Sequence, residues 1–430
     1  MKQVVRKLSG ERTFCKRTLK NGVRVVSEKI PHVRSVAVGL CLDVGSREET
    51  PLESGIAHVI EHMFFKGTAK RNVLEIATEI NNLGGNANAF TSQEMIVLHS
   101  KVIDEQLGRV FDLLADLLCN SLFSDTELER ERNVILEEIR MYEDTPDEQV
   151  IDNFTEALWR GSALGRPVLG RPQNIRRFKR RNLAAFMAKH FSPERLVISV
   201  AGNFDRKQLN RLVDGYFSDF GSGGEARQAD SPVPVFRNKE VKRPLEQAHF
   251  CLGSEGPARN TDDRFAYSLM NLILGGGMNS RIFQEVREKR GLAYSVGSMQ
   301  RPYRDTGYFA VTGGVQPKNL TAVTEVILGE IRRMHRESVS AEELQSAKEA
   351  FKGSVLLSLE NTSVRMSRLA DLELYFGRFI PIDEVMRKMN AVNVSQIQRV
   401  AEQHLKDRPV SISVIGPESL KIKGKTSLNF

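Results

Sequence analysis

The chain has 430 residues, of which 40% are hydrophobic and 27% are charged, and its formal net charge is +8. That length is too great for one compact core and predicts two domains of about 200 residues each. No apolar run is long enough to span a membrane, so we expect no membrane partner.

The first predicted elements are two short, valine-rich strands at residues 23–26 and 36–40. Long helical stretches separate such strand-like runs along the chain. This alternation predicts an α+β fold, in which helices pack on antiparallel-rich sheets to form α/β sandwich domains.

The next predicted element is an amphipathic helix over residues 54–65, with Ser54 as its N-cap. At about 100° per residue, His58, Glu61 and His62 share one face of this helix. We expect the helix to bury its other face and to present both histidines to a cleft. The face predicted to be buried carries Ile56, Val59, Ile60, Met63 and Phe64.

Histidines spaced four apart on one helix face can bind one zinc ion, and the intervening glutamate can lie beside a water molecule on that ion. The order His-x-x-Glu-His is one of the zinc-peptidase patterns. The alternative is a surface helix with two solvated histidines. A catalytic zinc site also needs a third protein ligand, so a further carboxylate is required.

Residues 86–100 follow the turn Leu83-Gly84-Gly85 and predict a strand. Its first side chains are short, so another backbone could approach closely and a peptide could add to the strand. The alternative is an ordinary strand within a sheet.

A second helix is predicted over residues 124–141, opened by a capping box. Glu131 and Glu138 project from its apolar face, whereas Glu137 points away and is expected to be solvated. A carboxylate among buried apolar side chains is costly unless a cation compensates it, so Glu138 is the candidate third ligand. The alternative is that both inward glutamates pair with Arg or Lys across a helix interface. The predicted apolar face consists of Leu128, Val134, Ile135, Ile139 and Met141.

The motif His58-x-x-Glu61-His62, followed 76 positions after His62 by Glu138, resembles the pitrilysin, or insulinase-like, family of zinc metallopeptidases. The resemblance covers nearly the whole chain and is closest in size to the single-unit processing peptidases, bacterial relatives of the mitochondrial processing peptidase. It implies a zinc metalloendopeptidase that holds one Zn²⁺ per chain through His58, His62 and Glu138. It further implies that Glu61 is the general base and that Glu131 supports the site. Other segments that resemble the family are residues 53–58, 84–91 and 275–281.

The resemblance also implies which residues bind the peptide substrate. These are Asn88, Ala89 and Phe90 on the predicted strand, together with Arg287 and Tyr294, which would grip the peptide and stabilise the oxyanion. Arg287 lies near the end of a predicted helix, and Tyr294 lies at the start of the next strand. By pattern alone, the two residues are an ordinary exposed arginine and an ordinary strand tyrosine.

The only dense basic run extends over residues 171–181 and includes Phe178. Such a run could form a phosphate-binding stripe, but a solvated helix face is the commoner outcome. Elsewhere the basic residues are mostly interleaved with acidic ones. We therefore expect no nucleic-acid partner.

The two halves of the chain end in a similar way. His190 and His404 each precede an Ile-Ser-Val strand pattern, and each is followed twelve residues later by a glycine, Gly202 or Gly416. This similarity predicts two homologous domains related by internal duplication. The segment between the halves is rich in Gly, Pro and polar residues and predicts a linker. The predicted boundaries are 13–218 for the N-terminal zinc-binding catalytic domain, 219–240 for the linker and 241–420 for the C-terminal domain that contributes substrate-binding residues.

Members of the family enclose a chamber with four such domains, so the resemblance implies a dimer of this two-domain chain. The dimer could be a homodimer or a heterodimer with a related non-catalytic subunit. The implied substrates are unfolded peptides or presequence-like segments, although the short run Gly275-Gly276-Gly277 does not imply presequence specificity. The alternative function is a non-catalytic structural or substrate-holding subunit, similar to the core proteins of a respiratory complex.

The four cysteines are scattered without the spacing of a metal site or a disulfide framework, and we expect them to be reduced. The N-terminal residues lack the apolar core of a secretory signal. Both features predict a cytoplasmic location. Ligand type alone does not separate zinc from manganese or cobalt, but two histidines and one glutamate favour zinc.

Overall fold

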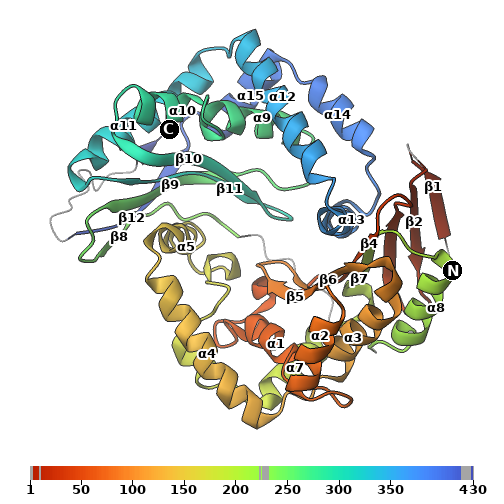
Figure 1. Cartoon of the computed structure of the whole chain (residues 1–430). Helices are drawn as coiled ribbons and strands as arrows, with labels where there is room; N and C mark the ends of the chain where they lie inside the picture. Colours follow the sequence, from red (N-terminus) through yellow and green to blue (C-terminus); the bar gives the residue numbers. More distant parts are fainter. Residues whose placement is uncertain (1–2, 9–10, 222–223, 225–231, 418–427, 430) are drawn as a thin grey trace. The chain divides into compact units, whose positions relative to one another are not determined.

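The computed structural model describes residues 3–8, 11–221, 224, 232–417 and 428–429, and Figure 1 shows its helices and strands. The chain forms two compact units, each assembled from three stretches of sequence. Parts of the predicted linker (222–223 and 225–231) and the end of the predicted C-terminal domain (418–420) lie outside the described residues, and the domain boundaries stay predictions. Unit 1 comprises Met1–Ile139, Pro167–Ala229 and Leu357–Phe379, and unit 2 comprises Arg140–Arg166, Asp230–Leu356 and Ile380–Phe430.

Within the described residues, unit 1 contains a seven-stranded sheet in the order β1-β2-β3-β7-β4-β6-β5. All neighbours in this sheet are antiparallel except β3 and β7, which run parallel. Every residue of β7 is buried, as expected for a central strand that is covered on both faces. The strands are β1 (Gln3–Lys7), β2 (Thr13–Thr18), β3 (Arg24–Lys29), β4 (Ser35–Leu42), β5 (Asn86–Thr91), β6 (Ile96–Ile103) and β7 (Leu196–Gly202).

Helices cover both faces of this sheet. Alternate residues of β4, including Val38 and Leu40, join one core with α1 and α3. On the other face Gly39 lies against α13, where an added Cβ would lie 2.3 Å from the Met366 sulfur. Ser199 Oγ donates a hydrogen bond to the Met366 carbonyl over 2.7 Å on the same face. The helices of unit 1 are α1 (Ile56–Phe64), α2 (Val73–Asn82), α3 (Leu107–Asn120), α4 (Asp125–Glu143, whose last turn enters unit 2), α6 (Pro172–Ile175), α7 (Arg180–His190), α8 (Arg206–Phe217) and α13 (Thr362–Phe376).

Unit 2 contains a second sheet, which among the described residues has six strands. Its strands are β8 (Lys239–Lys242), β9 (Ala248–Gly256), β10 (Ala293–Pro302), β11 (Gly307–Val315), β12 (Pro409–Gly416) and β13 (Leu428–Asn429). Its helices are α5 (Pro146–Leu158), α9 (Arg264–Gly275), α10 (Arg281–Phe283), α11 (Leu320–Arg336), α12 (Ala341–Ser358, which ends in unit 1), α14 (Ile382–Asn390) and α15 (Val394–His404).

The two sheets repeat one topology. Five strands of unit 1 are ordered β3-β7-β4-β6-β5, and five strands of unit 2 are ordered β8-β12-β9-β11-β10. The parallel pair occurs at the same place in both, because β8 runs parallel to β12 as β3 does to β7. His190 and His404 end the helices that precede β7 and β12. The predicted fold class, two α+β domains related by internal duplication, is therefore confirmed.

The units exchange one helix each. Helix α13 comes late in the sequence but packs on β3, β4 and β7 of unit 1, whereas α5 comes early and packs on β9 and β12 of unit 2. In Figure 1 the blue helix α13 accordingly lies beside red and orange strands. Buried carboxylates fix α13, since Arg365 pairs with Glu28 over 2.8 Å and Lys16 pairs with Glu373 over 2.7 Å. One face of each sheet is therefore covered by a helix from the other half of the sequence.

Candidate metal and catalytic site

Helix α1 has its N-terminus fixed by a buried carboxylate. Glu49 Oε2 accepts a hydrogen bond from the Gly55 backbone N–H over 2.9 Å, and Glu49 Oε1 accepts one from the Ala57 N–H over 3.0 Å. The predicted N-cap Ser54 is wrong, because the helix begins after Gly55, which has φ +98° and makes no side-chain cap. Glycine is required there, since an added Cβ would lie 2.8 Å from the Gly170 Cα. Glu49 thus satisfies the free N–H groups that a serine cap would satisfy.

The predicted faces of α1 are confirmed. The five apolar residues of its inner face are buried in the unit 1 core, and each is at most 1% exposed. His58 is buried as well, whereas Glu61 and His62 are partly exposed. The apolar face fixes the rotation of the helix about its axis, and this rotation determines where both imidazoles lie.

His58, His62 and Glu138 converge across α1 and α4. Glu138 Oε2 lies 3.7 Å from His58 Nε2 and 3.3 Å from His62 Nε2. Among the described residues these three form a group whose ligand atoms all lie within 4.8 Å of one another. Zinc bonds of about 2.0–2.2 Å in tetrahedral geometry separate neighbouring ligand atoms by roughly 3.4 Å. The donor set and its spacing therefore fit one zinc ion.

Helix α4 differs in part from its predicted pattern. Leu128, Ile135 and Ile139 are buried, but Val134 and Met141 are 50% and 68% exposed, so their assignment to the apolar face is wrong. In a 19-residue helix, the residues at the edge of the apolar face turn towards solvent as the face rotates around the axis. Glu131 is buried, and Glu138 is half-buried on the same side of the helix.

Glu131 contacts two basic groups. Its Oε2 lies 3.1 Å from His62 Nδ1, and its Oε1 lies 2.7 Å from Lys66 Nζ. The sequence left open whether this carboxylate supports a metal site or pairs with a basic residue, and its contacts with His62 and Lys66 fit both interpretations. With Nδ1 directed at Glu131, the other nitrogen of His62 is turned towards Glu138.

Glu61 does not join the metal-binding group. Thr91 Oγ1, at the end of β5, donates a hydrogen bond to Glu61 Oε2 over 2.6 Å. Burial raises the pKa of Glu61, and the bond from Thr91 partly opposes this rise. A carboxylate that is close to the three ligands but not among them is suited to move a proton.

The charges at the site depend on one another. Burial and the neighbouring His62 lower the pKa of His58 to about 4, so this imidazole is neutral and its Nε2 can bind a cation. Burial alone would lower the pKa of His62, but hydrogen bonds to Glu131 and Glu138 raise it to about 9. The hydrogen bond with His62 lowers the pKa of Glu138. The excess of carboxylate around His62 is favourable for a divalent cation.

The predicted substrate strand is shorter than expected. Residues 86–100 do not form one strand, because the chain turns after Thr91 and β6 pairs back antiparallel on β5. Among the described strands β5 pairs with β6 alone and is the edge of the sheet. Asn88 and Phe90 are exposed, while Ala89 is 7% exposed and belongs to the core. One side of β5 therefore pairs with no described strand, and β5 ends at Thr91, which contacts Glu61.

Arg287 and Tyr294 lie together in unit 2. The Arg287 guanidinium carbon is 4.6 Å from the centre of the Tyr294 ring and 4.9 Å from that of Phe283, which places the cation against two aromatic rings. Arg287 lies in a π-helical turn, Gln284–Glu288, and Tyr294 is 80% exposed near the start of β10. Wide turns of this kind often occur at functional sites.

Sequence reasoning missed three residues that hold this site, namely Glu49, Lys66 and Thr91. Lys66 follows His62 by four positions and could have been placed on the same side of the chain. Thr91 and Glu49 had no such signal, since their contacts depend on the hairpin and on the loop before α1. Among the described helices, none has both the length and the apolar content that crossing a membrane requires.

Two family profiles match the chain. The profile described as "Insulinase (Peptidase family M16)" matches residues 24–171, which include His58, His62 and Glu138. The profile described as "Peptidase M16 inactive domain" matches residues 177–351, which include Arg287 and Tyr294.

Curated relatives are similar over almost the full length. The "uncharacterized zinc protease YmxG" of Bacillus subtilis is 39% identical over 400 residues, which are 93% of this chain and 97% of the relative. An uncharacterized zinc protease of Streptomyces coelicolor is 38% identical, with 94% of this chain and 90% of the relative covered.

Solved structures share the fold. A peptidase M16 inactive domain from Pseudomonas fluorescens superposes with a TM-score of 0.88 at 22% identity, covering 95% of this chain and 99% of that one. A protease from Helicobacter pylori also has a TM-score of 0.88, at 23% identity, with coverage of 94% and 99%. Together with the closer relatives and the two profiles, these similarities show that the chain belongs to the insulinase family, peptidase family M16.

Proposed function

We propose that the chain is a zinc-dependent metalloendopeptidase in which His58, His62 and Glu138 hold one Zn²⁺. The observation that carries the proposal is the convergence of these three side chains beside a fourth, Glu61, that stays outside the metal-binding group. The names of the relatives, zinc proteases, support the choice of metal.

The bound zinc would polarise the scissile carbonyl and lower the pKa of water to about 7. Glu61 takes a proton from the attacking water and delivers it to the leaving amine, with one carboxylate oxygen held by Thr91. Glu131 orients His62 through Nδ1, and Lys66 balances the charge of Glu131.

The substrate in this proposal is an unfolded or presequence-like peptide that adds to β5. Main-chain hydrogen bonds to Asn88, Ala89 and Phe90 would hold the peptide with little demand on its sequence. Support comes from the edge position of β5 and from the contact of its last residue with Glu61. Arg287 and Tyr294 would bind the same peptide.

The proposed assembly is a dimer, either of two identical chains or with a related non-catalytic subunit. If sites are shared between subunits, mixing His58→Ala chains with Tyr294→Phe chains should restore part of the activity that each lacks. No recovery on mixing would mean that each chain completes its own site. A cytoplasmic location remains a prediction.

The test is mass spectrometry of an unfolded-peptide library incubated with the wild-type chain, the Glu61→Gln variant and the Glu137→Gln variant. Glu137 is exposed on α4, one residue from a proposed ligand, and serves as the matched control. We expect cleavage by the wild type and the control and none by Glu61→Gln. Cleavage by Glu61→Gln would contradict the assigned base.

Metal analysis separates the enzyme from the alternative, a non-catalytic subunit of the same family. The description of one matched profile as an inactive domain motivates this alternative, although that match does not include the metal-binding group. About one zinc per chain, lost in Glu138→Gln but kept in Glu137→Gln, supports the enzyme. A chain that takes up no zinc from excess would favour the non-catalytic role.

A further inference from the structure

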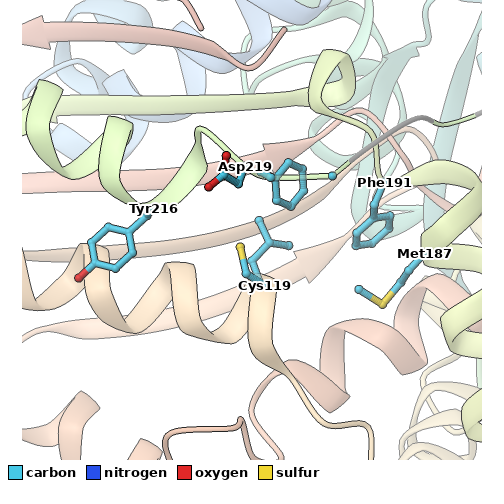
Figure 2. Close-up of a pocket in the computed structure, with 8 residues that line it drawn as sticks. Cys119, Met187, Phe191, Tyr216 and Asp219 are labelled. Carbon is cyan, nitrogen blue, oxygen red and sulfur yellow. The ribbon is translucent and has the colours of Figure 1, made fainter. Parts of the chain in front are cut away.

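A hollow of about 420 Å³ opens in unit 1, away from every residue assigned to the metal site. Its wall is formed by the end of α3, the end of α7 and the chain that leaves α8. Figure 2 shows Met187 and Phe191 on one side, Tyr216 and Asp219 on the other, and Cys119 between them. We refer to this hollow as the α3–α8 pocket.

The wall of the α3–α8 pocket combines apolar and aromatic side chains with a nearly equal share of polar surface. Leu118 and Phe191 are 2% and 7% exposed, and Met187 and Phe220 are partly buried beside them. The Tyr216 hydroxyl already donates a hydrogen bond to Asp112 over 2.9 Å, so its ring contributes mainly an apolar face. These residues offer three aromatic rings and a thioether to whatever enters.

The pocket has one charged group at its rim. Asp219 is exposed, and its carboxylate makes no hydrogen bond or ion pair with any residue that the structure describes. Every other side chain that lines the pocket is uncharged. A ligand that covers the pocket would therefore meet aromatic surface and a single negative charge.

The size and chemistry of the pocket identify a class of ligand. Small-molecule sites commonly measure about 300–1,000 Å³ and combine apolar walls with a few polar groups. Aromatic rings close to a carboxylate favour organic cations, because ring faces attract positive charge that water solvates poorly. We propose that the α3–α8 pocket binds a small organic cation with an apolar body, with Asp219 facing the charged nitrogen.

The experiment compares two probes of one shape. Benzyltrimethylammonium carries the charge, and neopentylbenzene has carbon in place of nitrogen. Saturation-transfer NMR with the full chain, with both probes at one concentration below the solubility limit of the hydrocarbon, should show binding of the cation and much weaker binding of the neutral probe. Equal binding of the two probes, or no binding of the cation, would overturn the proposal.

Two variants locate the bound cation. Asp219→Asn removes the charge with little change of shape and should weaken binding about fivefold, as expected for an exposed ionic contact. Asp262→Asn is the matched control, since Asp262 is an exposed aspartate of unit 2 outside the pocket, and it should bind as the wild type does. If both variants bind equally well, Asp219 does not recognise the cation.

Cys119 provides an independent block of the pocket. It is exposed, whereas Cys15, Cys41 and Cys251 are buried, so dithiodipyridine should attach one thiopyridyl group at this position. The bulky neutral adduct should abolish binding of the cation, and reduction with dithiothreitol should restore it. Binding that persists in the singly modified protein would place the cation elsewhere. Zinc content and peptide cleavage are expected to stay unchanged throughout, which separates this test from that of the peptidase.

Discussion

Thr91 Oγ1 donates a hydrogen bond to Glu61 Oε2 over 2.6 Å and so joins the end of an edge strand to the middle of α1, the helix that carries His58 and His62. No other described residue donates a hydrogen bond to the Glu61 carboxylate. The Thr91 hydroxyl thus fixes one carboxylate oxygen, and a hydrogen bond from the Thr91 backbone also lowers the pKa of Glu61.

Replacing Thr91 by valine tests the side-chain contact, because valine keeps the shape and the backbone N–H and loses the hydroxyl donor. The hydrogen bond lowers the pKa of Glu61, so its loss should raise that pKa and move the acidic limb of the kcat/KM profile to higher pH. We expect kcat to fall about tenfold, as for the loss of a hydrogen bond to a charged group. Thr91→Ser should restore both, and a valine variant with wild-type kcat and pH profile would exclude the role.

Glu49 should matter for stability as well as for the site. Glu49→Ala removes two hydrogen bonds to the first turn of α1 and should lower the free energy of unfolding of unit 1 by about 2 kcal/mol. Urea unfolding with and without zinc measures both this loss and the weaker binding of the metal. Glu53→Ala is the control, since Glu53 is only partly buried and its carboxylate accepts a hydrogen bond from the Thr50 N–H alone. An equal effect of the two substitutions would contradict the special role of Glu49.

Glu131→Gln should weaken zinc binding about 10- to 100-fold without removing a ligand. Glutamine cannot balance both His62 and Lys66, which share the two carboxylate oxygens. Competition with a chelating dye measures the affinity, and Glu137→Gln is again the exposed control. A Glu131→Gln chain with unchanged affinity would leave Glu131 as an ion pair with Lys66 only.

Asp152 on α5 should make unit 2 less stable at neutral than at acidic pH. Burial and the nearby Glu156 and Glu148 raise its pKa to about 6 from 3.8, with Lys239 acting in the opposite direction. The stability that the neutral carboxyl contributes is complete below pH 3.8 and is lost as the pH rises through 6. Asp152→Asn should therefore stabilise unit 2 at about pH 8, by at most about 3 kcal/mol, and have little effect near pH 4.

Thermal unfolding at several pH values checks this expectation, with Asp262→Asn as a control that should show no such dependence. A stabilisation by Asp152→Asn that did not change with pH would rule out ionisation of Asp152 as the cause.

Local pattern was sufficient to predict that His58, His62 and Glu138 converge. His58 and His62 are one helical turn apart, and the inward direction of Glu138 follows from its helix period, so short-range geometry determines most of the site. The role of Gly55 and Glu49 could not be predicted in this way. Gly55 packs against Gly170, more than a hundred positions later, and a contact of that kind leaves no local signal.

The duplication was visible in the sequence, but the helix exchange was not. The similar pattern around His190 and His404 indicates that the same helix-then-strand sequence ends each repeat. The sheet on which α5 or α13 packs depends on which sheet face is left for the helix to cover. Hydrophobic periodicity identifies the apolar side of a helix but not the sheet that it covers.

The exchange of α5 and α13 suggests how the chain arose and makes each half depend on the other for folding. In a single ancestral repeat with the same arrangement, one face of the sheet would be uncovered until a second copy of the repeat packed its helix there. Two such copies would form a symmetric domain-swapped dimer. Fusion of two such copies would retain the swap within one chain. Neither present-day half is therefore a self-sufficient protein, and a chain cut within residues 219–240 should behave as two fragments that fold only in each other's presence.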